Sequence, residues 1–280
     1  MSEEGHLHWV RGQVPESLRN AVHRSPLIEA EPRRALFRLA TVGRFLVRPG
    51  EPTVVEPSPD ATDTDIECFI RGPVAALACF LRGEFSLRGA AAEVRGGAVV
   101  ACGTSCGTSS LVANLALRGH PVIADSVVCV GGKPPHAAPL GEAGSTSVTL
   151  WPDSVTALGL DPKEGTPVRP ALAPRAFHLG PPKSRDRVRV AALVLLDQDN
   201  RLGGGNHLVA ETVAGFRAVG ILLQYQWHTR LARDLGMERD QFEWATDLAK
   251  AVPFTVLSWG TGKIGQTLPA LVEQAERLVA

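Results

Sequence analysis

The amino-acid sequence predicts an α/β protein with a mixed sheet, an N-terminal antiparallel β-layer and C-terminal helices. Three observations lead to this fold class. Polar and apolar residues alternate over residues 35–55, and an apolar strand, a glycine-rich loop and a helix follow one another over residues 97–130. A largely apolar run at residues 188–197 then precedes long stretches of helical spacing. With 280 residues and 44% hydrophobic content, the chain can bury a substantial core.

The N-terminal third predicts a short helix, a set of strands and a longer helix, in that order. Pro15–Val22 is expected to form the short helix, and the alternation from Ala35 to Val55 is typical of antiparallel strands. Pro49-Gly50 supplies a turn between two of them. Apolar residues from Asp65 to Leu81 are spaced for one face of a helix, and Gly72-Pro73 is expected to kink it.

The stretch that follows predicts a strand–loop–helix–strand unit. Ala98–Cys102 is a short apolar strand, and the loop Gly103–Ser109 leads into a helix that ends at Arg118-Gly119. Val122–Val130 is the second strand, and parallel strands joined in this way need a crossover helix. The loop therefore lies at a helix N-terminus, where free N–H groups and the helix dipole favour an anion.

The loop only partly matches the phosphate-binding pattern G-x-x-x-x-G-K-[ST]. Three residues separate Gly103 from Gly107, and Thr108 stands where lysine is expected. Ser109 retains the hydroxyl that binds magnesium in such loops. Phosphate binding and a glycine-rich turn needed only for tight packing are both open interpretations. The candidate nucleotide-binding residues are Gly103, Thr104, Ser105, Cys106, Gly107, Thr108, Ser109 and Ser110.

The segment after the second strand alternates between loops and short elements. Residues 131–145 are rich in Gly, Pro and Ala and predict a loop. A strand at Val148–Trp151 and a helix at Asp153–Leu160 follow. Residues 161–187 combine prolines with basic residues, which fits either a basic loop near an anion or a solvated connection.

The C-terminal third predicts a buried strand at Val188–Asp197, because that run is apolar on both faces. Two helices are expected, over Val209–Leu235 and Glu238–Lys250, and a break of the first helix at Gly215 or Gly220 is an open alternative. A last strand at Pro253–Trp259 and a closing helix at Leu268–Val279 complete the chain.

One further glycine motif, Gly260–Gly265, matches G-x-G-x-x-G. Only fifteen residues follow it, too few for the second strand and the acidic residue of a dinucleotide site. We interpret it as a strand–helix connection.

The charge balance and the hydrophobicity of the sequence argue against two classes of binding partner, nucleic acids and membranes. Lys+Arg and Asp+Glu are balanced at 29 each, which argues against nucleic acid and against a polybasic membrane anchor. No apolar run approaches the roughly 20 residues of a transmembrane helix, and the N-terminus lacks the pattern of a secretory signal. The five cysteines stand in apolar surroundings typical of buried thiols in a reducing compartment, so a cytoplasmic location is expected.

Five segments of the chain carry a resemblance to a known family: Leu87–Val94, Ala98–Ser105, Ser109–Gly119, Ala124-Asp125 and Val148–Leu160. Through them the sequence resembles the HPr kinase/phosphorylase family, and most closely the HPr-kinase-like proteins of bacterial peptide natural-product clusters such as those for lasso peptides. This resemblance implies a P-loop core that binds ATP and magnesium and phosphorylates a serine on a peptide or small protein. It also makes a homo-oligomer an expectation.

The family's site residues transfer to this chain in part. Its loop serine and its first acidic residue correspond to Ser109 and Asp125, which the resemblance implies as magnesium ligands, with Asp125 as a catalytic carboxylate. Arg88, Thr108 and Ser126 occupy the positions of the family's histidine, lysine and second acidic residue. Arg88 is a candidate to replace the missing positive charge, although a solvent-facing or Glu93-paired strand residue is an equal alternative. Local structural roles remain open for Ser109 and Asp125.

Two functions follow from this combination of matches and mismatches. The first is an ATP- and Mg²⁺-dependent serine kinase with an altered active site, acting in a bacterial biosynthetic pathway. The second is a pseudokinase with a degenerate Walker A loop, which binds a peptide or an enzyme without transferring phosphate. In both cases we expect a single domain over residues 1–280, with an N-terminal layer over 1–84 and a P-loop-like core over 85–280.

Overall fold

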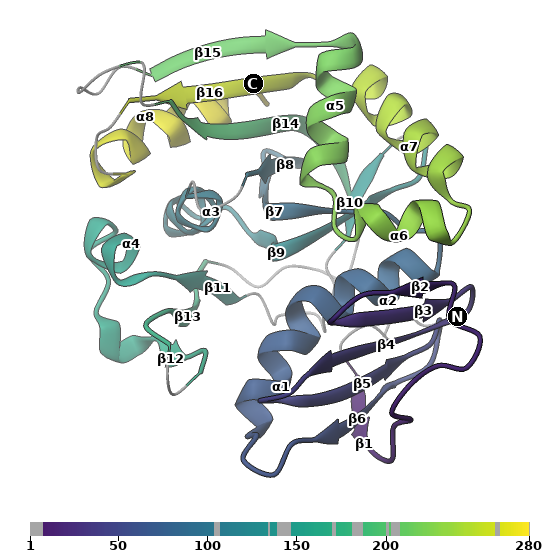
Figure 1. The fold of residues 1–280 in the computed structure, drawn as a ribbon. Helices are drawn as coiled ribbons and strands as arrows, with labels where there is room; N and C mark the ends of the chain where they lie inside the picture. The colour runs from purple at the N-terminus through teal and green to yellow at the C-terminus, as the bar shows by residue number, and fades with distance from the viewer. Residues whose placement is uncertain are drawn as a thin grey trace.

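The structure is a computed structural model that describes residues 8–103, 107–133, 135–138, 147–169, 172–180, 187–199, 202, 208–260 and 264–279. Within these residues the fold is mixed α/β, as predicted, and contains three sheets. Figure 1 shows the N-terminal sheet and the larger central sheet with helix α2 between them. The predicted division at residue 84 falls between α2 and the first strand of the central sheet.

The N-terminal sheet has six strands in the order β1-β6-β5-β4-β3-β2, antiparallel except for the β1–β6 pair. It confirms the strands predicted between Ala35 and Val55. Phe37 and Phe45 face its buried side and meet edge to face, with ring centroids 5.7 Å apart. The strands are β1 (Trp9–Arg11), β2 (His23–Arg24), β3 (Ile28–Glu31), β4 (Arg34–Leu39), β5 (Gly43–Val47) and β6 (Thr53–Pro57).

The helix predicted at Pro15–Val22 is wrong, since this segment has no helical turn. Its backbone bonds to the sheet instead. The Leu18 N–H donates to the Glu29 carboxylate at 2.7 Å, and the Val22 N–H donates to the Ala30 carbonyl at 2.9 Å. These tertiary partners satisfy the backbone groups that a helix would have paired internally.

The helical segment after the first sheet is kinked where the sequence predicted. Thr62 caps α1 (Asp63–Phe69) in a reciprocal capping box with Asp65. A π-helical segment, η1 (Ile70–Val74), contains the kink, where Gly72 has φ −113° and ψ −113° ahead of Pro73. The chain continues as α2 (Ala75–Leu81), which packs against both sheets.

The central sheet has seven strands in the order β10-β9-β7-β8-β14-β16-β15. Strands β8 and β9 run parallel, as predicted, but β7 lies between them and is antiparallel to both. Strand β10 pairs with β9 and with the start of β14, so the sheet curls round at that end. The strands are β7 (Ser86–Val94), β8 (Gly97–Cys102), β9 (Val122–Gly131), β10 (His136–Ala138), β14 (Val188–Gln198), β15 (Leu208–Val213) and β16 (Phe254–Trp259).

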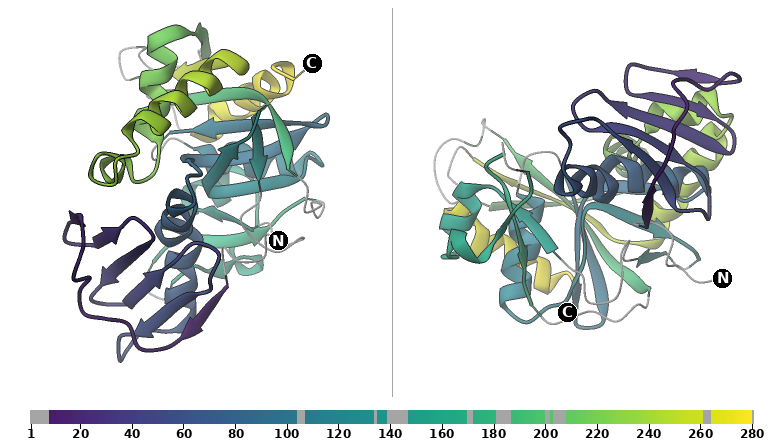
Figure 2. Two further views of the ribbon diagram at one scale, coloured as in Figure 1. Left: turned by 90° about the vertical axis from the view of Figure 1, so that its right-hand side faces the viewer. Right: turned by 90° about the horizontal axis from the view of Figure 1, so that it is seen from below.

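Helices cover both faces of the central sheet (Figure 2). On one face, α3 (Thr108–Leu117) and α8 (Ile264–Arg277) bury a cluster that includes Leu111 and Leu271. On the other face, α5 (Gly215–Tyr225) and α7 (Glu238–Ala251) bury Leu222 and Leu248.

Three smaller elements extend these layers. Helix α4 (Pro152–Ala157) contacts α8, and α6 (Thr229–Asp234) reaches the core of the N-terminal layer through Leu231. A third sheet has the order β11-β13-β12. Its strands are β11 (Ser147–Leu150), β12 (Thr166–Pro167) and β13 (Arg175–His178), with a 3₁₀ turn, η2, at Pro162–Glu164.

The helix predicted from Val209 is wrong over its first residues. Leu208–Val213 is the edge strand β15, which pairs antiparallel with β16. Valine and threonine in this segment favour a strand, and the free edge of β16 outweighs the helical spacing. The structure confirms the strand at 188–197, the helix at 238–250 and the strand at 253–259, while α8 begins four residues earlier than predicted.

Candidate functional site

The predicted anion loop begins and ends on glycines whose backbone conformation other residues rarely adopt. Gly103 follows β8 with φ +146°, and Gly107 precedes α3 with φ +87°. The Gly103 N–H points to the Arg88 carbonyl of β7 at 3.4 Å. Among the residues that the structure describes, no side chain caps the N-terminus of α3. The predicted loop residues Thr104, Ser105 and Cys106 lie outside the described residues.

Ser109 and Asp125 meet, although sixteen residues separate them. The Ser109 hydroxyl, in the first turn of α3, donates to Asp125 Oδ1 on β9 at 2.7 Å. Since β7 separates β8 from β9, the helix carries Ser109 across that strand to reach the carboxylate. This contact brings together the two residues that match the family pattern.

A third residue, which sequence reasoning missed, holds the same carboxylate. The backbone N–H of Thr149, on β11, donates to Asp125 Oδ2 at 2.8 Å. No signal in the sequence points to Thr149, because a backbone donor depends on where the strand lies and not on the side chain.

The Asp125 carboxyl is half-buried, and its burial raises its pKa above the usual aspartate value. Hydrogen bonds from Thr149, Ser109 and the Ser126 backbone oppose that rise but do not cancel it. A carboxylate of this kind accepts a proton more readily than an exposed aspartate does. Such behaviour suits a group that takes a proton from a hydroxyl.

The oxygen atoms at this point fit a hard cation. A hydroxyl and a carboxylate oxygen are ligands that Mg²⁺ accepts, usually together with water and phosphate oxygens. Ser109 Oγ and Asp125 Oδ1 are therefore the pair able to contribute to such a site. Asp125 Oδ2 accepts the Thr149 N–H, which limits the carboxylate to one ligand oxygen.

Two further loop residues have different surroundings. Thr108 is the first residue of α3 and is partly exposed. Ser110 is buried, and its hydroxyl bonds to the Ser154 hydroxyl of α4 at 2.8 Å. The side chain of Ser110 thus joins two helices, which leaves only its backbone as a candidate for phosphate contact.

Arg88 lies against an aromatic ring at the edge of this region. Its guanidinium carbon is 4.6 Å from the centre of the Trp227 ring, and the Trp227 indole N–H donates to the Ser126 carbonyl at 3.1 Å. Trp227 lies between α5 and α6, a position that the sequence had assigned to one long helix. The aromatic contact places the Arg88 charge near Ser126, one residue from Asp125.

His228, the residue after Trp227, helps to hold the α5–α6 connection in place. It adopts φ +57°, and its Nε2 bonds to the Pro73 carbonyl at 2.9 Å, which links the connection after α5 to the kink. Burial lowers the pKa of His228 to about 4, so the ring is neutral near pH 7.

The basic segment 161–187 contacts the N-terminal layer through Arg169 and Arg187. Arg187 Nη2 lies 3.7 Å from Glu84 Oε1. Arg169 donates to Asp65 at 2.7 Å and lies over the Phe69 ring of α1. Lys183 and Arg185, two further basic residues of this segment, lie outside the described residues, as do residues 261–263 of the second glycine motif.

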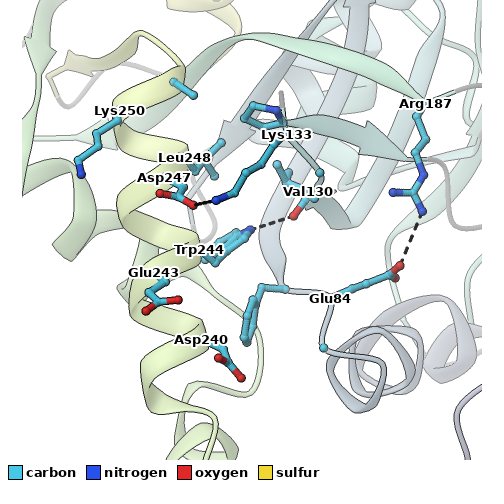
Figure 3. Close-up of a pocket in the computed structure, with 16 residues that line it drawn as sticks. Glu84, Val130, Lys133, Arg187, Asp240, Glu243, Trp244, Asp247, Leu248 and Lys250 are labelled. Carbon is cyan, nitrogen blue, oxygen red and sulfur yellow. Dashed lines mark hydrogen bonds and ion pairs between the residues drawn. The ribbon is translucent and has the colours of Figure 1, made fainter.

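A cavity of about 640 Å³ lies away from Asp125, where α7 faces the ends of β9 and α2 (Figure 3). The Phe85 and Trp244 rings, 5.5 Å apart, form part of its apolar lining. An ion pair between Lys133 and Asp247, at 2.7 Å, crosses its rim. Because α7 and α3 cover opposite faces of the sheet, this cavity is separate from the Ser109–Asp125 site.

Comparisons with known proteins do not assign a family to this chain. Among the described residues, no helix is long and apolar enough to cross a membrane. No family model matches the sequence, and no curated protein matches it significantly. The resemblance to HPr-kinase-like proteins therefore stays a prediction from the motif residues.

Proposed function

We propose that this chain is an HPr-kinase-like P-loop protein that binds ATP with Mg²⁺ and phosphorylates a serine of a peptide or small protein. The observation that supports this proposal most is the 2.7 Å hydrogen bond between Ser109 and Asp125, beside the N-terminus of α3, which no side chain of the described residues caps. A helix N-terminus, a hydroxyl and a carboxylate are the groups that a nucleotide–magnesium site requires.

Each residue has a role in this proposal. The N–H groups at the start of α3 contact phosphate oxygens, and Ser109 with Asp125 Oδ1 supplies the protein ligands of the metal ion. Asp125 takes the proton of the attacking serine hydroxyl, for which its raised pKa is suitable. Arg88, held on the Trp227 ring, offsets negative charge in place of the absent loop lysine.

A pseudokinase is the second candidate, and one observation favours it. Both Asp125 oxygens already accept hydrogen bonds from the protein, and one carboxylate would have to serve as metal ligand and as base. Thr108 at the lysine position removes a charge-assisted contact worth about 1.5–3 kcal/mol. In this case the chain binds a peptide or enzyme partner, with or without nucleotide, and transfers no phosphate.

Thermal unfolding with millimolar Mg·ATP tests nucleotide binding. Ligand at 100 times its Kd stabilises the folded state by about 2.7 kcal/mol, which raises the Tm by roughly 5–10 °C for a chain of this size. We expect Ser109→Ala to lose most of this shift. Ser154→Ala is the matched control, because it removes a neighbouring serine hydrogen bond without touching Asp125. The absence of any shift for the wild-type chain would refute nucleotide binding.

Slow ATP hydrolysis separates the two candidates once binding is established. Water can replace an unidentified serine acceptor, so an active kinase site is expected to release phosphate above the Ser109→Ala background. A Tm shift without phosphate release would favour the pseudokinase.

A further inference from the structure

Two buried cysteines from different layers of the fold meet at hydrogen-bonding distance. The Cys129 thiol of β9 donates to Cys79 Sγ of α2 across 2.7 Å, although the residues are 50 positions apart. Cys79 is fully buried, and Cys129 is 5% exposed. Both are free thiols. Their sulfur atoms need little movement to come within bonding distance.

A cation lies beside one of the two sulfur atoms. Arg82 Nη2 is 3.6 Å from Cys79 Sγ and 2.5 Å from Glu84 Oε2, so the guanidinium bridges the sulfur and a carboxylate. Cys79 Sγ thus accepts from two donors, Arg82 and Cys129, and a positive charge lies beside the sulfur. The hydrogen bond to Cys79 and burial raise the pKa of the Cys129 thiol, which therefore keeps its proton.

We propose that Cys79 and Cys129 form a dithiol that a hydroperoxide oxidises to a disulfide between α2 and β9. The Cys79 thiolate attacks one peroxide oxygen, so that an S–O bond forms, the O–O bond breaks and hydroxide leaves. Cys129 then loses its proton and attacks the sulfur of the sulfenic acid. The S–S bond forms, the S–O bond breaks, and the balance is two thiols and one H₂O₂ giving one disulfide and two waters.

The surroundings of the pair suit a small oxidant. Glu84, which holds Arg82, also lines the cavity in Figure 3, so this cavity reaches the residue next to the thiols. Hydrogen peroxide is small and uncharged, whereas the burial of both sulfurs excludes a bulky disulfide reagent.

The same residues raise the alternative of a metal site. Among the described residues, the Sγ atoms of Cys79 and Cys129 and a Glu84 oxygen lie within 4.8 Å of one another. Two thiolates bound to tetrahedral zinc at about 2.3 Å would hold their sulfurs much farther apart than the sulfurs are here. The Arg82 guanidinium also lies between Cys79 and Glu84, where an ion would have to bind. These contacts favour the thiol pair.

Peptide mapping of the full wild-type chain tests the proposal directly. The protein is treated with H₂O₂, unfolded in N-ethylmaleimide and digested. We expect an intact mass lower by two hydrogen atoms, a linked peptide pair containing Cys79 and Cys129, and full reversal by dithiothreitol. Closing a 50-residue loop is expected to raise the Tm by roughly 5–15 °C.

Variants test the role of each group. Cys79→Ser and Cys129→Ser should each abolish the linked peptides, whereas Cys68→Ser, the matched control at a partly exposed thiol, should retain them. Arg82→Gln should slow oxidation at least about fivefold without changing the product. The wild-type map decides the outcome even if a cysteine variant fails to fold.

Three results would overturn the proposal. They are a disulfide formed by a different pair, two freely alkylated thiols after peroxide treatment, and bound zinc that protects both thiols without any crosslink. Since none of these measurements uses nucleotide, the proposal and the kinase-like function succeed or fail separately.

Discussion

Two substitutions of Asp125 distinguish a functional role of its carboxylate from a structural role. The carboxylate accepts two short hydrogen bonds, at 2.7 Å from Ser109 and at 2.8 Å from Thr149. Asp125→Ala removes both acceptors and leaves the Thr149 N–H without a partner. The free energy of unfolding should fall by about 1–3 kcal/mol, and the Tm by roughly 2–4 °C for each kcal/mol.

Asp125→Asn should behave differently. Its amide oxygen can accept the Thr149 N–H, and its NH₂ group can donate to Ser109 Oγ, so both contacts have a neutral substitute. We expect a stability within about 1 kcal/mol of wild type. The Mg·ATP shift should nevertheless disappear, because an amide cannot supply the charge that a metal ion needs.

The raised pKa of Asp125 predicts how pH changes the stability of wild type relative to Asp125→Asn. Burial raises the pKa of Asp125 in the folded state above its unfolded value. The stability that follows from this rise is complete below the ordinary aspartate pKa, and it is lost as the pH rises through the folded pKa. As the pH rises from about 4 to about 8, the free energy of unfolding of Asp125→Asn should therefore increase relative to that of wild type.

Urea unfolding of wild type, Asp125→Ala and Asp125→Asn at pH 4 and at pH 8 measures these differences in the free energy of unfolding. The reasoning is refuted if Asp125→Asn at pH 8 is as unstable as Asp125→Ala, because the ionised carboxylate would then stabilise the fold. It is also refuted if the stability of Asp125→Asn falls relative to that of wild type as the pH rises.

Two other predictions concern the strands and the connection around this site. Gly89→Ala should cost more than about 3 kcal/mol or prevent folding, since an added Cβ would lie 1.9 Å from the Ala101 carbonyl oxygen. Gly131→Ala, where an added Cβ has no neighbour within 4 Å, should unfold within about 1 kcal/mol of wild type in the same urea titration. For His228, the folded pKa of about 4 lies below its ordinary 6.5, so the associated stability is complete above 6.5 and is lost as the pH falls towards 4. Between pH 7 and pH 4.5, the free energy of unfolding should fall by about 2–3 kcal/mol less for His228→Gln than for wild type. Parallel plots of this free energy against pH for the two proteins would contradict the low pKa of His228.

The parts of the fold that sequence reasoning predicted are those with strong local signals. The apolar run of β8, the glycines that need positive φ and the helix after them are all set by residues within a few positions of one another. The same holds for the kink at Gly72-Pro73. Ser109 and Asp125 could be paired in advance because their motif positions, and not their sequence distance, suggested that they meet.

The parts that failed depend on contacts between distant segments. Strand β15 exists because β16 offers it an edge, and the Leu18 backbone N–H is held by Glu29 of β3. Thr149 and Trp227 reach the candidate site only through the positions of β11 and of the α5–α6 connection. The proximity of Cys79 to Cys129 likewise comes from the packing of α2 on β9, to which no periodicity points.

The position of β7 between β8 and β9 limits how this chain can change in length during evolution. The β7–β8 hairpin turns through Arg95 and Gly96, both with positive φ, and its register sets Gly89 opposite Cys102. One residue inserted in β7 before that turn would reverse the facing of every earlier β7 side chain and bring a larger residue against Ala101. Homologous chains should therefore keep this hairpin at constant length, and insertions should accumulate in the connections outside it.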